Sequence, residues 1–183
     1  MLAKDSRAPV VYLRSFEVDR TARGFEGLIF GSLKDLGPIV AIGRPDEKSP
    51  SESRIARAYL TDDQWQDRVS DLIGRARLVV AQIGTSEGLV WELIQAVHLL
   101  RPDQLIVCLG GRRHTNLRYQ QFREQTSPIF PRGLPDQIQG SGFITFGPDW
   151  APIPSRELKS SEGDYMSWVL QGLHRRLFRS SRR

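Results

Sequence analysis

The feature that most constrains this chain is the regular alternation of short apolar runs with amphipathic helical segments. Five runs of strand length are bounded by glycine, proline or polar residues, and helical spacing of apolar residues follows them. The runs cover residues 9–16, 38–43, 77–84, 104–110 and 142–146. Near-continuous apolar strands are typical of parallel sheets, in which helical crossovers bury both faces. Because such crossovers are right-handed, the pattern predicts an α/β fold: a flavodoxin-like, doubly wound, five-stranded parallel sheet of order 2-1-3-4-5 with helices on both faces.

The helical segments and the loops complete this organisation. We predict helices from Phe25 to Leu36, from a capping box at Thr61 to Ala76, from Leu89 to Leu100, around 116–125 and over 163–178. A long polar loop is expected at 44–58, where proline, serine and charged residues gather. The 183 residues are thus interpreted as a flexible N-terminus (1–8), one domain (9–178) and a basic C-terminal tail (179–183).

The charge and cysteine content narrows the possible partners. The net charge of +5 is carried by five arginines near the C-terminus, so the basic end either contacts an anionic surface weakly or is simply solvated. We expect no transmembrane segment and a cytoplasmic location. The lone Cys108 lies in an apolar run and is interpreted as a core residue. Three separated histidines offer no metal-ligand spacing, so no metal site is predicted.

Residues 78–93 form the most informative stretch. An apolar strand stops at Gly84, small polar residues follow, and a helix begins with Glu92 about two turns in, at the edge of its apolar face. Ligands of open α/β sheets bind beyond the carboxyl ends of the strands, so Glu92 is the leading catalytic candidate. The alternative is a surface acid that stabilises the helix dipole by a few tenths of a kcal/mol. In the predicted order, Arg14, Ser15 and residues 85–92 share one crevice, with the 44–58 loop over it.

Several catalytic classes are disfavoured by the absence of their motifs. The chain has no glycine-rich phosphate-binding loop of the kinase, ATPase or dinucleotide-binding type after its first strand. It also lacks a nucleophile elbow, so Ser15 and Ser86 are poor hydrolase nucleophiles. Any chemistry is therefore expected to depend on a carboxylate.

Three segments resemble Toll/interleukin-1 receptor (TIR) domains. The run from Val11 to Arg20 (Val-Tyr-Leu-Arg-Ser-Phe-Glu-Val-Asp-Arg) is similar to their first box, and Ile42-Gly43-Arg44-Pro45 is similar to their second strand and the loop that follows. Trp91-Glu92-Leu93 resembles the place of the glutamate that cleaves NAD in enzymatic TIR domains. The resemblance covers residues 9–147 in the order of elements.

One departure concerns the residues before the glutamate. Enzymatic TIR domains carry a Trp-Cys pair four and three residues before it, where this chain has Gly88 and Leu89. Gly88 is instead similar to the glycine-x-x-x-glutamate of nucleoside 2-deoxyribosyltransferases, whose glutamate attacks the sugar. Both families break a bond between a ribose-type sugar and a base.

The resemblance implies an NAD glycohydrolase in signalling or defence, activated by self-association, with NAD as substrate and no cofactor. The alternatives are a non-enzymatic TIR-like adaptor or nucleotide-binding module and a deoxyribosyltransferase-like enzyme. A carboxylate can stabilise the oxocarbenium-like state that develops on the sugar, and the leaving nicotinamide needs little acid help. Besides catalytic Glu92, the expected substrate-binding residues are Arg14, Ser15, Phe16, Arg44, Gly84, Thr85, Ser86, Gly88 and Trp91. For Arg14 and Arg44 the alternative is a solvated side chain, and for Trp91 it is packing.

Overall fold

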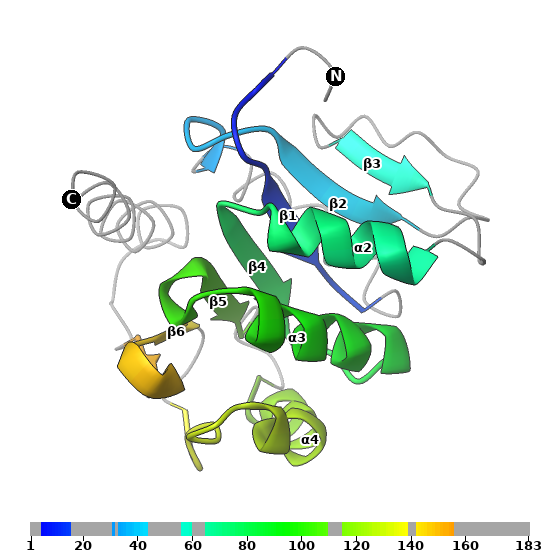
Figure 1. Cartoon of the computed structure of the whole chain (residues 1–183). Helices are drawn as coiled ribbons and strands as arrows, with labels where there is room; N and C mark the ends of the chain where they lie inside the picture. The colour runs from blue at the N-terminus through cyan, green and yellow to red at the C-terminus, as the bar shows by residue number, and fades with distance from the viewer. Residues whose placement is uncertain are drawn as a thin grey trace.

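The computed structural model describes residues 5–15, 31, 33–43, 56–59, 65–109, 115–138 and 142–155. Its centre is a seven-stranded sheet of order β3-β2-β1-β4-β5-β6-β7 (Figure 1). The strands are β1 (Val10–Leu13), β2 (Ile39–Gly43), β3 (Ala56–Tyr59), β4 (Leu78–Gln82), β5 (Leu105–Cys108), β6 (Phe143–Phe146) and β7 (Pro152–Pro154). The described helices are α2 (Trp65–Gly74), α3 (Glu87–Leu99) and α4 (Thr115–Thr126), with short 3-10 turns at Pro102–Gln104, Ser127–Ile129 and Pro148–Trp150.

The predicted spatial order of the five apolar strands matches that of β2, β1, β4, β5 and β6, but the all-parallel prediction is wrong. Strands β3, β2, β1, β4 and β5 are parallel, whereas β6 runs antiparallel to β5 and β7 antiparallel to β6. The sheet is therefore mixed, and the α/β class holds.

The antiparallel direction of β6 follows from the segment after α4. This segment lies along the helix: the Tyr119 hydroxyl donates to the Pro135 carbonyl at 2.6 Å, and Arg123 forms an ion pair with Asp136. The chain thereby returns to the edge where β5 ends, and the Leu109 N–H donates to the Gly142 carbonyl at 2.9 Å. Since β6 begins beside the end of β5, the two strands run in opposite directions.

Two strands were not predicted. Residues 56–58, assigned to the 44–58 loop, lie in β3, which pairs with β2 at the edge of the sheet. At the other edge, β7 is bonded to β6 on both sides of its prolines. The Gly147 N–H donates to the Ala151 carbonyl, and the Ser155 N–H to the Phe143 carbonyl, both at 2.8 Å.

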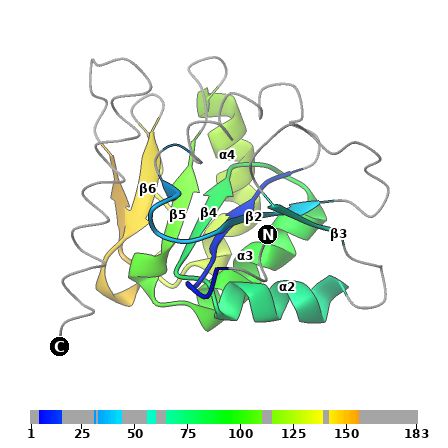
Figure 2. The ribbon, with the colours of Figure 1, turned by 90° about the horizontal axis from the view of Figure 1, so that it is seen from above.

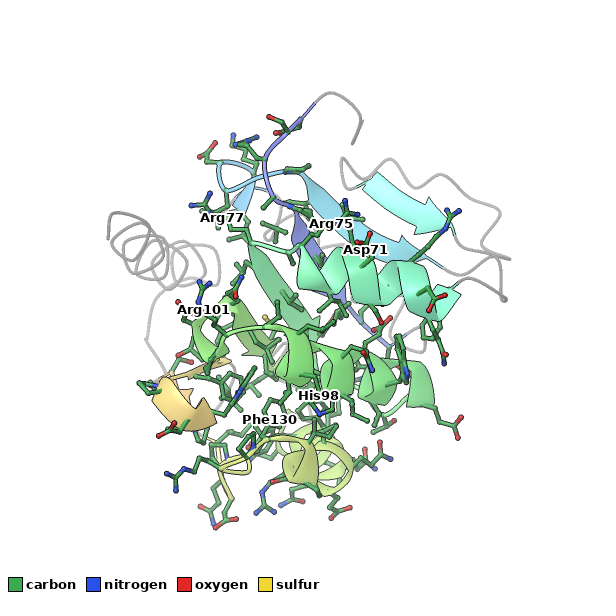
Figure 3. The ribbon with its side chains drawn as sticks, in the orientation of Figure 1. Asp71, Arg75, Arg77, His98, Arg101 and Phe130 are labelled. Atoms are coloured by element: carbon green, nitrogen blue, oxygen red, sulfur yellow. The ribbon has the colours of Figure 1, made fainter. Side chains whose placement is uncertain are left out.

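The hairpin between β6 and β7 turns through two residues in the left-handed region. Asp149 has φ 56° and Trp150 has φ 60°, which is costly for residues other than glycine. Aromatic packing holds this turn in place. Trp150 packs against Phe146 with ring centroids 5.4 Å apart, and Phe146 stacks on Phe130 at 4.9 Å (Phe130 is labelled in Figure 3).

The core lies on both faces of the sheet. On one face the helices α2, α3 and α4 bury their apolar sides, and Figure 2 shows α2 and α3 along this side of the sheet. The predicted stripe of α2 is confirmed by buried Val69 and Ile73, and that of α3 by Leu89, Leu93 and Ala96. On the other face, Leu33 and Leu36 pack with Tyr12 and with Cys108, which is buried as predicted.

The remaining sequence predictions concern residues that are only partly described. Most of the helix expected at 25–36, the helix expected at 163–178, residues 44–55 of the expected loop and the basic tail lie outside the described residues. Within the described chain, none of the helices combines the length and apolar character needed to cross a bilayer.

Candidate active site

The unit from β4 to α3 forms the expected strand-loop-helix arrangement. Strand β4 is fully buried, and the Ser86 hydroxyl caps α3 by accepting a hydrogen bond from the Leu89 N–H at 3.4 Å. Glu87 is exposed in the first turn. A capping oxygen and an early carboxylate complement the unpaired N–H groups at a helix start. The cap fixes where α3 begins and therefore where Glu92 lies.

The position of Glu92 on α3 follows from the 100° turn per residue. Leu89, Leu93 and Ala96 face the sheet, whereas the neighbours of Glu92 on its other side face α2. Trp91 meets Trp65 of α2, and Gln95 accepts from Ser70 at 3.4 Å. Glu92 lies between these two sides on the helical wheel. Its side chain is therefore directed toward the angle between α2 and the sheet.

Glu92 is far more shielded than its place at the edge of the apolar face indicated. The residue is 3% exposed, so the partial shielding predicted from the sequence is an underestimate, and the interpretation as a solvated surface acid is wrong. Burial raises the pKa of its carboxyl from 4.5 to about 8, and among the residues that the structure describes no hydrogen bond or charge contributes to the shift. A buried carboxyl without an opposite charge favours its neutral form.

The end of β1 adjoins the end of β4, as the predicted crevice requires. In the register of these parallel strands, Leu13 pairs with Ala81, so Ser15 lies beside the residues that follow β4. A Cβ atom placed on Gly84 would lie 2.4 Å from the Ser15 Cβ and 3.2 Å from Leu89 Cδ2. Gly84 is therefore needed because a side chain would overlap with Ser15.

The Ser15 hydroxyl has an unusual environment. The residue is 1% exposed, and within the described part of the chain no group forms a hydrogen bond with its Oγ atom. Leaving a buried hydroxyl unpaired costs about 1–3 kcal/mol. Such groups are rare in native structures and often mark a functional site.

Two other predicted site residues have structural roles in the described conformation. Trp91 packs on Trp65 with ring centroids 4.8 Å apart and planes inclined by 39°, and both rings contact the core. Packing, one of the two roles considered for Trp91, is thus accounted for. Ser86 caps α3, as described above, through one of the two acceptor sites of its hydroxyl oxygen.

Arg14 follows β1 and is 5% exposed, so the interpretation of this arginine as solvated is wrong. Nearby in the sheet, the Tyr12 hydroxyl donates to the Gln82 Oε1 atom at 2.6 Å in a buried hydrogen bond. This pair was not predicted. The signal in the sequence is Gln82, a polar residue at the end of the otherwise apolar run of β4.

The other predicted residues do not carry comparable evidence. Thr85 and Gly88 are half-buried, and a Cβ atom on Gly88 would meet nothing within 4 Å. Phe16 and Arg44 lie outside the described residues. Within the described part of the chain, no cluster of three or more potential metal ligands is found.

Several labelled arginines lie at the amino ends of the central strands, away from the start of α3. Figure 3 shows Arg75, Arg77 and Arg101 near the beginning of β4 and the end of α3. Arg75 pairs with Asp71, and Arg101 pairs with Asp103. Since α3 rises about 1.5 Å per residue and ends at Leu99, its last residue lies roughly 10 Å along the helix from Glu92, and Arg101 follows beyond it.

Comparison with known proteins gave no match: neither a protein-family model, nor a curated protein, nor a solved structure is similar to this chain. Functional inference therefore depends on the site itself. The site combines a buried carboxyl, an unpaired buried hydroxyl and a close backbone approach at Gly84. A carboxyl in an apolar setting can bind a cation, stabilise developing positive charge or exchange a proton near neutral pH.

Proposed function

We propose that this chain is a TIR-like NAD glycohydrolase of the flavodoxin-like class, with Glu92 as its catalytic carboxylate. The parallel strands run in the order β3-β2-β1-β4-β5, and the four strands β2, β1, β4 and β5 among them follow the order expected for that class, with β3 added at the edge. Edge strands of opposite direction are common in such sheets. The observation that carries the proposal is Glu92 itself. It is buried in the second turn of α3, the helix that follows the carboxyl end of β4, and among the described residues no charge contributes to the shift of its pKa.

The chemistry matches this environment. The bond between C1′ of the ribose and the pyridinium nitrogen breaks, and its electron pair leaves with neutral nicotinamide. Water then forms the new bond at C1′ and releases a proton, which gives ADP-ribose. The ionised Glu92 stabilises the positive charge on the sugar ring, where low local polarity strengthens the attraction.

Glu92 must be ionised for this reaction, and the positive charge of the substrate favours its ionisation. A carboxyl with a pKa of about 8 is mainly neutral at pH 7 in the free protein. A positive charge at hydrogen-bonding range lowers such a pKa by stabilising the carboxylate. Binding of the pyridinium would therefore generate the charged form that the reaction needs.

Access to the site requires movement. Glu92 and Ser15 are shielded from solvent in the described conformation, so a nucleotide cannot reach them without displacement of covering residues. Activation by self-association, which the resemblance to TIR domains implies, would supply this opening. The expected location is cytoplasmic, with NAD or a related nucleotide as the partner.

The test is incubation of the protein with NAD, alone and with a crowding agent that favours assembly, followed by chromatographic measurement of free nicotinamide. Glu92→Gln should lower turnover by at least about 100-fold, equivalent to about 2.7 kcal/mol of transition-state stabilisation. Glu87→Gln is the matched control, because Glu87 lies in the same helix but is exposed. Equal loss of activity in both variants, or none in either, would contradict the assignment of Glu92.

The same incubations distinguish the alternatives. Transfer of a 2-deoxyribosyl group from a nucleoside to a free base, without release of nicotinamide from NAD, would indicate deoxyribosyltransferase chemistry. Binding of nucleotide without turnover in an assembled preparation would favour the non-enzymatic module.

A further inference from the structure

We infer that Ser15 is a further substrate-contacting residue, whose side chain binds a ribose hydroxyl beside Glu92 and selects ribose over deoxyribose. This inference rests on the proposed function, because it assigns the sugar that the site accepts. It goes beyond the catalytic carboxylate by naming the group that determines specificity.

The Ser15 hydroxyl is buried without a hydrogen-bond partner in the described part of the chain. Ser15 is 1% exposed, and its Oγ atom is shielded from solvent and has no hydrogen-bond partner among the described residues. An alanine at this position would avoid the cost of leaving a buried hydroxyl unpaired. A polar ligand that enters the site would provide the missing partner and recover this free energy.

The Ser15 side chain is directed to the face of the sheet that α2 and α3 cover. Side chains alternate along β1, and Leu13 contributes to the same face of the sheet as α2 and α3. Ser15, two residues later, is directed to this face if the alternation continues. The close approach to Gly84 and the nearby Leu89 agrees with this direction, because Leu89 is a sheet-facing residue of α3.

Leu89 also connects Ser15 to Glu92. The two residues are three apart on α3, so they are neighbours on its surface. Ser15 and Glu92 are therefore directed into the same region, bounded by α2, α3 and the ends of β1 and β4. Within the described residues, the Ser15 hydroxyl has no hydrogen-bond partner, and no hydrogen bond contributes to the pKa shift of Glu92.

The chemistry of the two groups selects a sugar with neighbouring hydroxyls. A carboxylate only accepts hydrogen bonds, whereas a serine hydroxyl both donates and accepts. The 2′- and 3′-hydroxyls of ribose can satisfy both groups at once. A sugar that lacks one hydroxyl leaves a buried polar group unpaired, which sites of this kind reject strongly.

The experiment is a double-mutant cycle. The Ser15 hydroxyl is removed from the protein and a ribose hydroxyl from the substrate, separately and together. Wild type and Ser15→Ala are assayed for nicotinamide release from NAD and from analogues that lack the 2′- or the 3′-hydroxyl of the nicotinamide riboside. Wild type should prefer NAD over one of these analogues by about tenfold beyond the intrinsic reactivity difference, which Ser15→Ala should lose. Ser70→Ala is the matched control, because Ser70 already bonds Gln95 and its loss should leave the preference unchanged.

Thermal unfolding shows whether the effect is structural. Because the Ser15 hydroxyl is unpaired, Ser15→Ala should unfold at the same temperature as wild type or higher. If removal of the serine hydroxyl and removal of either sugar hydroxyl affected the rate independently, so that their free-energy costs simply added, the inference would be overturned.

A failure of the proposed function gives a different result. If wild type releases no nicotinamide, calorimetric binding of NAD and the two analogues replaces the rate measurement. Preference for ribose that disappears in Ser15→Ala would still support the role of Ser15. Equal binding of all three compounds by wild type, or no binding at all, would overturn it.

Discussion

Replacing Glu92 by glutamine should change how the stability of this protein depends on pH. In the folded protein, burial raises the pKa of the carboxyl to about 8, whereas an unfolded glutamate keeps a value near 4.5. Between these values the folded state holds a proton that the unfolded state has released. Stability from this group is therefore complete below about pH 4.5 and is lost as the pH rises toward 8.

The magnitude follows from the two pKa values. Each pH unit well inside this window costs about 1.4 kcal/mol, and less near its two ends, so wild type should lose about 3.5 kcal/mol of unfolding free energy between pH 5 and pH 8. Glutamine cannot titrate, so Glu92→Gln should lack this loss. The buried amide of the variant changes the free energy of unfolding by the same amount at every pH. The burial of Glu92 is therefore tested by how the free energy of unfolding changes with pH.

The assay is equilibrium denaturation in urea at pH 5, 6, 7 and 8. Three proteins are compared: wild type, Glu92→Gln and the exposed control Glu87→Gln. Other titrating groups act equally in all three, so they cancel in the differences. Parallel curves for wild type and Glu92→Gln across the whole range would refute the burial of an unpaired carboxyl.

Two further outcomes follow from the same site. The rate constant kcat/KM for nicotinamide release should rise about tenfold per pH unit below pH 8 and level off above it, because free Glu92 must ionise, and a flat profile measured from pH 6 to 9 would contradict this role. Gly84→Ala should destabilise the protein by about 1–3 kcal/mol through overlap with Ser15, as urea denaturation would show. The matched Gly88→Ala should be neutral or stabilising by up to about 1 kcal/mol, because its new methyl group meets nothing within 4 Å and alanine favours a helix; equal destabilisation by both would contradict the close packing of Gly84.

The order of the central strands could be predicted because it depends on local patterns. Apolar runs such as Leu78–Gln82 are long and unbroken, and helical spacing between them implies crossovers. β3 escaped notice because Ala-Arg-Ala-Tyr contains a charged residue and no apolar run. β7 was missed because prolines normally argue against a strand.

The direction of β6 depends on contacts distant in sequence, so no local pattern revealed it. The helix α4 would follow β5 in either case, and the return of the chain along α4 through Tyr119 and Arg123 decides the outcome. The burial of Glu92 has a similar origin. Its helical position predicted an edge, but the residue is 3% exposed in the folded chain, and the tertiary packing that shields it cannot be seen in the sequence around residue 92.

The two prolines of β7 limit how copies of this protein can associate. Ala151 and Ser155 direct their backbone groups toward β6, so the alternation of a strand directs those of Pro152 and Pro154 outward. Proline has no N–H, and the outer edge of β7 therefore offers no donor over these residues. Strand addition from a second copy is blocked at this edge, as in sheets protected against aggregation. Self-association of the kind expected for activation must use other surfaces, and substitution of both prolines would expose the protein to uncontrolled sheet extension.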